Sequence, residues 1–115
     1  MYNKEIAIVY DKVHQTKNYA LEAQRIKAHF SDNISNVLDI GCGTGGHSVA
    51  LAKLGYKVTG VDPSKYMIDI AKQKSDKAFE IDYKIGFLED LNIRKHEAAV
   101  SMFNVVNHIL DFTKL

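Results

Sequence analysis

The sequence predicts an α/β fold in which a mainly parallel β-sheet forms the middle of three layers. Short apolar runs alternate with segments of helical periodicity, a glycine-rich turn follows the first run, and an acidic residue ends the second. Strands joined through helices are parallel, because each right-handed crossover returns the chain to the same edge of the sheet. We expect the spatial strand order 3-2-1-4. We also expect a single domain, since 115 residues suffice for one domain and not for two.

The first half of the chain is expected to hold two helices and two strands. From Asn18 to about Phe30 the apolar residues recur at helical spacing. Residues 36–40 are a short apolar run that ends at a glycine, which is typical of a buried strand. A mostly apolar helix is expected over 47–54, with Gly55 placed to close it. Residues 56–61 are then expected to form a second buried strand.

The second half continues the alternation. Pro63 stands where a first helical residue is expected, and apolar residues at helical spacing extend that helix to about Lys74. Strands are expected over 82–87 and 98–103, and another helix is expected to begin at Val105. The pattern as a whole is that of a doubly wound sheet.

Composition excludes several classes of protein. Hydrophobic residues make up 46% and charged residues 25%, which is typical of a globular domain and not of a disordered chain. A net charge of +1 gives no electrostatic reason to expect nucleic acid or an anionic membrane as partner. The single cysteine cannot form an intrachain disulfide or a thiolate zinc site, and the spacing of His29, His47 and His96 is not that of metal ligands. No run approaches the ~20 apolar residues of a membrane span or resembles a signal peptide, so we expect a cytoplasmic protein without a metal.

The glycine-rich turn is the most informative segment. Gly41, Gly43 and Gly46 follow the pattern G-x-G-x-x-G between a predicted strand and a predicted helix. Asp62 lies 21 positions after Gly41, at the end of the next strand, where a carboxylate reaches ribose hydroxyls. Glycine suits such a turn because it adopts positive φ and lets a ligand approach the backbone. We therefore expect a nucleotide or nucleoside ligand at this turn.

Asp39 discriminates between the ligands that such a turn holds. A dinucleotide places its pyrophosphate at the start of the helix, whereas Asp39 places a carboxylate at the same end of the strand. Two like charges about 5 Å apart repel by about 3 kcal/mol at an effective dielectric constant of 20. S-adenosylmethionine has no phosphate and carries a sulfonium and an ammonium group. Asp39 therefore favours this methyl donor over NAD, although an NAD-dependent oxidoreductase remains the alternative in another enzyme class.

Five segments resemble a known family. Residues 37–45 (VLDIGCGTG) are similar, almost letter for letter, to motif I of class I S-adenosylmethionine-dependent methyltransferases, whose fold is Rossmann-like. Residues 60–64 (GVDPS) resemble the acidic segment of that family, 85–91 (IGFLEDL) its adenine-side segment and 98–103 (AAVSMF) its fourth strand. Residues 10–19 (YDKVHQTKNY) resemble the lid of the branch that contains sugar-amine N-methyltransferases. The resemblance implies methyl transfer to a small polar acceptor, with nitrogen favoured weakly over oxygen or carbon on the lid alone.

The resemblance also implies which residues contact the donor. The glycines would lie along its methionine and ribose parts, Asp39 would face the methionine end, Asp62 would take both ribose hydroxyls and Met67 would pack near the adenine. The sequence departs from the family where many members have Gly-Asp, because Gly86 is followed by Phe87 here. Glu89 or Asp90, or the backbone of Leu88, would replace the missing carboxylate. The implied donor-binding set is Asp39, Gly41, Gly43, Thr44, Gly45, Asp62, Pro63, Met67, Leu88, Glu89, Phe103 and Tyr19, and the product is S-adenosylhomocysteine.

Other side chains are weaker candidates. Asn104, Asn107 and His108 follow the fourth strand at the carboxyl edge, where they would orient an acceptor and His108 would act as a general base. Methyl transfer to an amine needs little base catalysis, so His108 has an idle surface role as its alternative. His14, Lys17 and Tyr19 are candidates for closing over the donor carboxylate, with a solvated lysine and a core tyrosine as the alternatives.

Cys42 has no partner base specified nearby, and we interpret it as a small side chain packed under the loop rather than as a nucleophile.

The fourth predicted strand is apolar on both faces although it would lie at an edge of the sheet. Class I methyltransferases continue with three more strands, which usually help to build the acceptor pocket. The resemblance therefore implies residues 1–35 as lid and helix and 36–115 as a donor-binding core that is truncated after the fourth strand. We expect self-association through the exposed fourth strand, and a non-catalytic donor-binding module is a further alternative.

Overall fold

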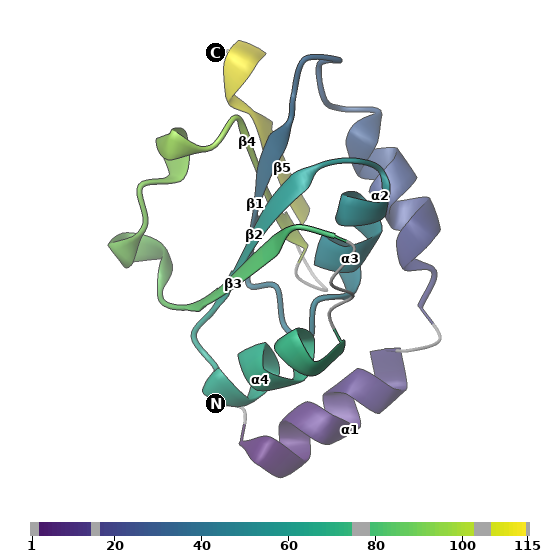
Figure 1. Ribbon diagram of the computed structural model, residues 1–115, viewed down its shortest axis with the longest axis vertical. Coiled ribbons are helices and arrows are strands. Elements are labelled where there is room, and N and C mark those ends of the chain that lie inside the picture. Colours follow the sequence, from purple (N-terminus) through teal and green to yellow (C-terminus); the bar gives the residue numbers. More distant parts are fainter. Residues whose placement is uncertain (1–2, 15–16, 75–78, 103–106, 115) are drawn as a thin grey trace.

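In the computed structural model, which describes residues 3–14, 17–74, 79–102 and 107–114, the chain forms one mixed β-sheet (Figure 1). The order of its strands is β3-β2-β1-β4-β5. The strands are β1 (Asn36–Ile40), β2 (Lys57–Asp62), β3 (Ile81–Ile85), β4 (Ala98–Met102) and β5 (Asn107–Asp111). The predicted α/β class and the order 3-2-1-4 are confirmed, with one strand added beyond β4.

The strands β1 to β4 run parallel, so their carboxyl ends meet at one edge of the sheet. Asp39 on β1 is paired with Gly60 on β2 and with Val100 on β4. Asp62, the last residue of β2, is paired with Ile85, the last residue of β3. This register places the end of β1 and its glycine-rich turn beside Asp62, as open α/β sheets require at a ligand-binding edge.

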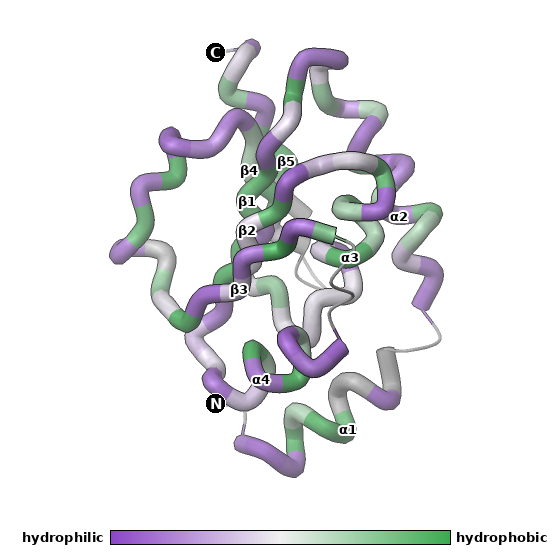
Figure 2. The backbone as a smooth tube through the Cα atoms, in the orientation of Figure 1, coloured by the Kyte–Doolittle hydropathy of each residue, from purple (hydrophilic) through white to green (hydrophobic). Residues whose placement is uncertain are grey.

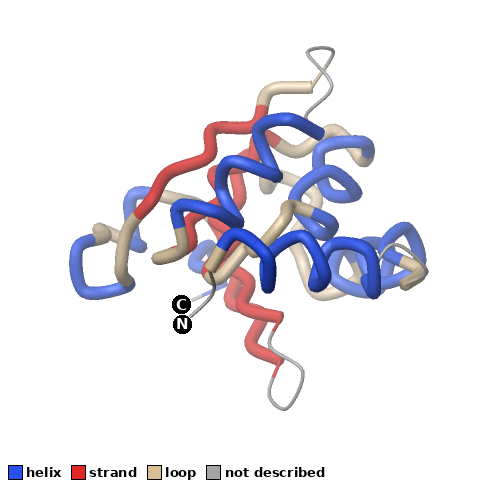
Figure 3. Tube along the Cα trace, turned by 90° about the horizontal axis from the view of Figure 1, so that it is seen from below, coloured by secondary structure: helices blue, strands red, loops and turns tan. Residues whose placement is uncertain are grey.

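The α-helices of the described residues lie on one side of the sheet or beyond it, and short helical turns lie on the other side (Figures 1 and 3). The helices are α1 (Lys4–His14), α2 (Tyr19–Lys27), α3 (Gly46–Lys53) and α4 (Lys65–Lys74). Successive right-handed crossovers from β1 to β2 and from β2 to β3 move in the same direction, so α3 and α4 cover the same face. The α1 helix, which the sequence analysis did not identify, packs against α4.

Each face of the sheet has its own apolar core. On the helical face, α2 and α3 bury Ile26 and Leu51 against Val37 and Val100. On the other face Leu38 is fully buried with Val61 and Ala99. The cover there comes from η1 (Leu88–Asp90), η2 (Ile93–Lys95) and η3 (Phe112–Lys114), which contribute Leu91, Ile93 and Phe112 at or beside them. The expected three layers are present, with turns instead of helices in the third; Figure 2 shows hydrophobic residues along the central strands.

Local signals explain where the helices begin and end. Asn18 caps α2 by accepting a hydrogen bond from the Leu21 N–H at 3.0 Å. Gly55 follows α3 with φ of 101°, as a helix-closing glycine does. The α4 helix begins at Lys65 and not at Pro63, because the Ser64 hydroxyl accepts from the Met67 N–H at 3.3 Å. The predicted start of this helix is therefore two residues too early.

The helix expected from Val105 is wrong. Residues 107–111 form β5, which pairs antiparallel with β4, from Ala98 opposite Asp111 to Met102 opposite Asn107. The backbone of an apolar strand needs hydrogen-bond partners, and a local antiparallel return supplies them. Within β5, Ile109 packs on the core while Leu110 is 46% exposed, which is the two-residue period of a strand. The edge of β4 is therefore not exposed, and this removes the reason given for self-association through it.

The amino ends of the strands are held by two carboxylates. Glu97 Oε1 accepts hydrogen bonds from the N–H and hydroxyl of Ser35, at 2.9 and 2.7 Å, and from the N–H of Asn36 at 3.1 Å. Asp111 Oδ2 accepts from the N–H and hydroxyl of Ser31, at 2.8 and 2.7 Å. These bonds lower the pKa of Glu97, and bonds from Thr113 and Ser31 lower that of Asp111 despite opposing desolvation. Both carboxylates thus join segments about 60 to 80 residues apart in sequence.

Within the described part of the chain, no helix has the length and apolar character needed to cross a membrane. The same residues contain no group of three or more His, Cys, Asp or Glu placed to hold a metal ion.

Candidate functional site

The turn after β1 depends on glycines in the left-handed region. Gly41, Gly43 and Gly45 have φ of 69°, 57° and 89°. A side chain at such angles is strained, which explains why the turn needs glycine. The N–H groups of Gly41 and Cys42 both donate to the carbonyl of Val61, at 2.8 and 3.0 Å, and hold the turn against the end of β2. The predicted strand–turn–helix arrangement is therefore present.

Asp62 connects this turn to the next helix. Its Oδ2 accepts from the Gly43 N–H at 3.0 Å, and its Oδ1 accepts from the Ser64 N–H at 2.9 Å. Although Asp62 is only 7% exposed, a carboxylate oxygen accepts more than one hydrogen bond. Asp62 is thus oriented by its own backbone contacts and still has capacity for hydroxyl groups of a ligand.

Asp39 is a buried carboxyl group at the same edge. It is 2% exposed, and its Oδ2 accepts from the hydroxyl of Ser48 at 2.6 Å. Burial raises the pKa of Asp39 from 3.8 to about 7, the Ser48 hydrogen bond lowers it in part, and the charge of Asp62 raises it further. A cation placed beside Asp39 would favour its ionised form, whereas an anion would oppose it.

Beneath the turn lies a packed layer that the sequence analysis did not identify. The Tyr83 ring on β3 packs against Gly60 and places its hydroxyl where a Cβ of Gly45 would be. Cys42 packs in the same cluster, and burial, followed by the charges of Asp39 and Asp62, raises the pKa of its thiol well above the usual range. Cys42 is therefore a poor nucleophile, in agreement with the interpretation as a packed side chain. The signal for this layer in the sequence was Ser48, a polar residue directly before the apolar run 49–52.

The start of α2, with Lys17 just before it, lies beside the first turn of α3. The Tyr19 ring occupies the space where a Cβ of Gly46 would be, and it meets the His47 ring edge-on at a centroid distance of 4.9 Å. Glu22 Oε1 lies 3.4 Å from Lys17 Nζ and 3.3 Å from His47 Nε2. Lys17 and Tyr19 are thus close to the glycine turn and are ordered by contacts within the chain. The side chain of His14 lies outside the described residues.

On the other side of Asp62 lies the segment that is expected to border the adenine. The Gly86 N–H donates to the Asp62 carbonyl at 3.1 Å, Met67 is buried nearby on α4, and Phe87 is 53% exposed. Glu89 lies in the exposed turn η1. Thr44 is buried within the glycine turn and Pro63 is exposed.

Five candidates have side chains outside the described residues. Phe103 and Asn104 lie outside the described residues, as do the side chains of Asn107 and His108, whose backbone belongs to β5. The side chain of Leu88 is likewise outside them. The expected roles of these residues stay predictions.

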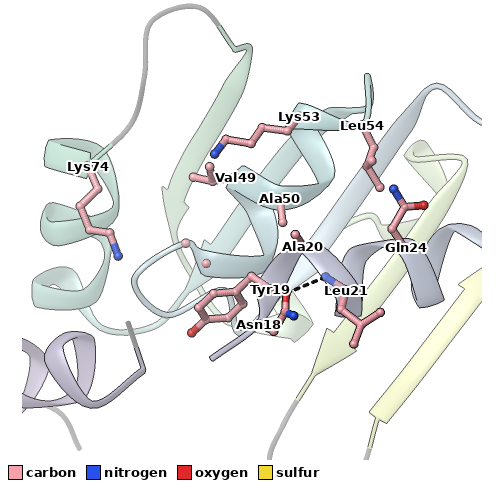
Figure 4. A pocket seen from close by; sticks show the side chains of 12 residues that line it. Asn18, Tyr19, Ala20, Leu21, Gln24, Val49, Ala50, Lys53, Leu54 and Lys74 are labelled. Atoms are coloured by element: carbon pink, nitrogen blue, oxygen red, sulfur yellow. Dashed lines mark hydrogen bonds between the residues drawn. The ribbon is translucent and has the colours of Figure 1, made fainter. Parts of the chain in front are cut away.

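A separate pocket of about 600 Å³ lies between α2, α3 and the end of α4 (Figure 4). Figure 4 shows the side chains of Lys53 and Lys74 at this pocket together with Val49 and Leu54. Gly45 and Gly46 contribute to its wall, but Asp39 and Asp62 do not. The pocket therefore lies on the side of the glycine turn that faces away from Asp39 and Asp62.

The chain is similar to known proteins in sequence and in fold. Residues 37–114 match the methyltransferase domain family. The chain is 42% identical over 76 residues to a ubiquinone biosynthesis O-methyltransferase of Bradyrhizobium diazoefficiens and 38% identical over 76 residues to one of Pelagibacter ubique. These matches cover 65% of this chain and 30% and 32% of those proteins, so the match spans about a third of the length of the curated relatives.

Solved structures of methyltransferases have a similar fold. A putative S-adenosylmethionine-dependent methyltransferase of Methanococcus maripaludis superposes with a TM-score of 0.81 at 27% identity, over 91% of this chain and 52% of that one. DesVI of Streptomyces venezuelae superposes with a TM-score of 0.69 at 26% identity, over 90% of this chain and 44% of that one. Together with the family match over residues 37–114, these likenesses show that the chain belongs to the class I S-adenosylmethionine-dependent methyltransferases.

Proposed function

We propose that the protein transfers a methyl group from S-adenosylmethionine to a small molecule and that residues 36–115 form its donor site. The observation that carries this proposal is the pair of acidic side chains at one sheet edge, Asp39 and Asp62, on either side of a turn of positive-φ glycines. An arrangement with two acidic groups suits a cationic ligand with ribose hydroxyls and opposes a diphosphate.

The residues present fit the donor. Asp62 is oriented by Gly43 and Ser64 and keeps acceptor capacity for both ribose hydroxyls. The turn at Gly41 and Gly43 presents backbone rather than side chains to the methionine part. Asp39 supplies a carboxyl group whose ionisation a nearby cation would favour. Bound there, S-adenosylmethionine supplies an electrophilic methyl group on its sulfonium, and the chain contributes orientation and complementary charge.

In this proposal the adenine is bordered by backbone and uncharged side chains rather than by a carboxylate. No carboxylate follows Gly86, where the chain has Phe87. The hydrogen bond from Gly86 to the Asp62 carbonyl holds this segment beside the ribose site. The backbone of Leu88, with the exposed Phe87 ring and the buried Met67, would then border the adenine.

For the acceptor we propose a phenolic oxygen. The curated relatives are named as O-methyltransferases of ubiquinone biosynthesis, and this supports oxygen over the nitrogen that the lid segment favoured. Asn104, Asn107 and His108 stay candidates for orienting the acceptor, with His108 as the base that removes a phenolic proton.

Calorimetric titration of the full-length protein with S-adenosylmethionine and with NAD tests the donor site. We expect micromolar binding of the methyl donor and no binding of NAD. Binding of NAD alone would overturn the proposal in favour of an oxidoreductase. Transfer of a labelled methyl group to catechols but not to amines would establish the acceptor class, whereas donor binding without transfer to either panel would indicate a non-catalytic module.

A further inference from the structure

Three buried hydroxyl and carboxyl groups meet under the glycine turn. Asp39 comes from β1, Ser48 from α3 and Tyr83 from β3, and all three side chains are at least nine-tenths buried. Buried polar groups destabilise a fold unless they are hydrogen-bonded, and an apolar side chain at any of these positions would avoid that penalty. Their convergence at the donor edge calls for a functional explanation.

Ser48 is oriented toward Asp39. Its hydroxyl donates to Asp39 Oδ2 at 2.6 Å, a short distance that is typical of a hydroxyl bound to a carboxylate. Because the single hydroxyl proton is used in this bond, the lone pairs of the Ser48 oxygen remain available to accept from another group.

Tyr83 carries a donor without an acceptor. Among the described residues, its hydroxyl is the buried side-chain oxygen or nitrogen that makes no hydrogen bond. Ser48 lies close enough to lower the pKa of Tyr83, although burial and the charges of Cys42 and Asp39 raise it overall. The phenol therefore stays protonated. Its ring is held in place against Gly45 and Gly60, so the position of its hydroxyl oxygen is fixed.

The charges around Asp39 lack a compensating cation. Asp62 at the end of β2 raises its pKa, and the other titratable groups facing it are Cys42 in the turn and Tyr83 on β3. The α3 helix contributes Ser48, whereas the neighbouring His47 pairs with Glu22 instead. The α4 helix contributes apolar side chains to this cluster. A cationic ligand is thus the natural source of positive charge for the ionised carboxylate.

We propose that Ser48 and Tyr83 are positioning residues of the donor site, whose hydroxyl groups form a chain from Tyr83 to Ser48 to Asp39 that holds the Asp39 carboxylate ionised when the cationic donor is bound. This rests on the proposed donor binding. In this arrangement the ionised Asp39 accepts the hydrogen bond that the Ser48 hydroxyl donates, and the Tyr83 hydroxyl donates a hydrogen bond to a lone pair of the Ser48 oxygen. Both hydroxyl groups stay neutral, so Ser48 and Tyr83 contribute hydrogen bonds and no charge.

The consequence is that donor binding releases a proton. Burial raises the pKa of Asp39 to about 7, so the free carboxyl is mostly protonated at pH 6 and mostly ionised at pH 8. If only the ionised form binds, donor affinity rises about tenfold from pH 6 to pH 8. Loss of the Ser48 hydrogen bond raises the pKa further and moves the midpoint of this rise upward.

Calorimetric titration of the full-length protein with S-adenosylmethionine from pH 5.5 to 8.5 tests the chain of hydroxyl groups. We expect Ser48→Ala to move the midpoint up by about one pH unit and to weaken binding about fivefold at pH 7, with a smaller loss at pH 8.5. Tyr83→Phe should move the midpoint in the same direction by less, and Ser48→Thr, which keeps the hydroxyl, should restore the wild-type profile.

Two controls isolate the effect. Tyr56→Phe also removes a tyrosine hydroxyl, but from the core cluster that contains Phe30, and should leave the profile unchanged. Asp39→Asn removes the titrating carboxyl, so any pH dependence that it retains belongs to the ligand.

The outcomes separate this inference from the proposed function. Failure of the wild-type protein to bind the donor at any pH would overturn the proposed function. Wild-type binding with the same affinity loss in Ser48→Ala at every pH would overturn only the positioning role. Proton release near pH 6.5 that Ser48→Ala changes, measured in buffers of different ionisation enthalpy, would support it.

Discussion

The two edges of the sheet use carboxylates in opposite ways. At the amino edge, Glu97 and Asp111 each accept several hydrogen bonds from serine and backbone donors, and their pKa values lie below the usual range. At the carboxyl edge, Asp39 is buried with one serine hydroxyl, and its pKa is raised to about 7. The same functional group is saturated with donors at one edge and left short of them at the other.

This difference distinguishes a structural carboxylate from one that awaits a ligand. Glu97 ties the start of β1 to the start of β4, and its charge is satisfied within the chain. Asp39 has one hydrogen bond, from Ser48, to stabilise its charge, and burying the ionised carboxylate lowers the stability of the free protein at neutral pH. Perturbed carboxyl groups at a sheet edge that binds ligands are typical of functional sites.

The largest effect expected concerns Asp39 itself. Its folded pKa of about 7 lies above the ordinary value of 3.8, so its favourable contribution is present below pH 3.8 and is lost as pH rises toward 7. We expect the stability of Asp39→Asn relative to wild type to increase by about 4 kcal/mol across that range, at about 1.4 kcal/mol per pH unit. Urea unfolding at pH 4.5, 6 and 8 measures this change. If the difference in unfolding free energy between Asp39→Asn and wild type stays constant with pH, Asp39 does not differ from the carboxylates at the amino edge in the way described.

Gly45→Ala tests the packing under the turn. The new methyl group would overlap the Tyr83 hydroxyl, and the alanine would have to adopt the φ of 89° found at this position. We therefore expect a loss of about 3 kcal/mol in the free energy of unfolding. Gly55→Ala is the matched control, because φ there is 101° but no atom lies within 4 Å. It should lose only the backbone part, about 1 kcal/mol. Equal losses would show that Tyr83 does not restrict the turn.

Asp62→Asn addresses donor binding. An amide accepts at one oxygen only, so the Asn side chain cannot serve both Gly43 and the ribose hydroxyls as the carboxylate does. We expect donor affinity to fall about 100-fold in calorimetric titration, equivalent to about 2.7 kcal/mol. Asp82→Asn makes the same change on an exposed residue of β3 and should leave affinity unaltered.

The smallest effect is expected at the amino edge. Since hydrogen bonds from Ser35 and Asn36 depress the pKa of Glu97, its contribution to stability is present above pH 4.5 and lost as pH falls. Glu97→Gln should therefore lower Tm at pH 7, and the difference in Tm from wild type should disappear toward pH 3. The variant should not change donor affinity. Calorimetry at both pH values, with the exposed Glu80→Gln as control, measures this. A lower donor affinity in Glu97→Gln would contradict the separation of the two edges.

Residue patterns predicted the parallel core well because its signals are local. The apolar run at 36–40, the glycines of the turn and Asp62 define strand, turn and acidic end within a few residues of each other. The β5 strand was mistaken for a helix, since its strand character depends on pairing with β4 and not on its own periodicity. The α1 helix was missed for a similar reason, because it packs against α4 through contacts distant in sequence.

The amino-acid sequence by itself determined the strands of the parallel core, the glycine turn and the positions of Asp39 and Asp62, because local periodicity and backbone requirements act over short stretches. Only the tertiary structure decided that Ser48 and Tyr83 lie beside Asp39, and that Glu97 and Asp111 each accept hydrogen bonds from donors more than 60 residues away. Ionisation of a carboxyl group depends on burial and on neighbouring donors, and both exist only after distant segments have packed together.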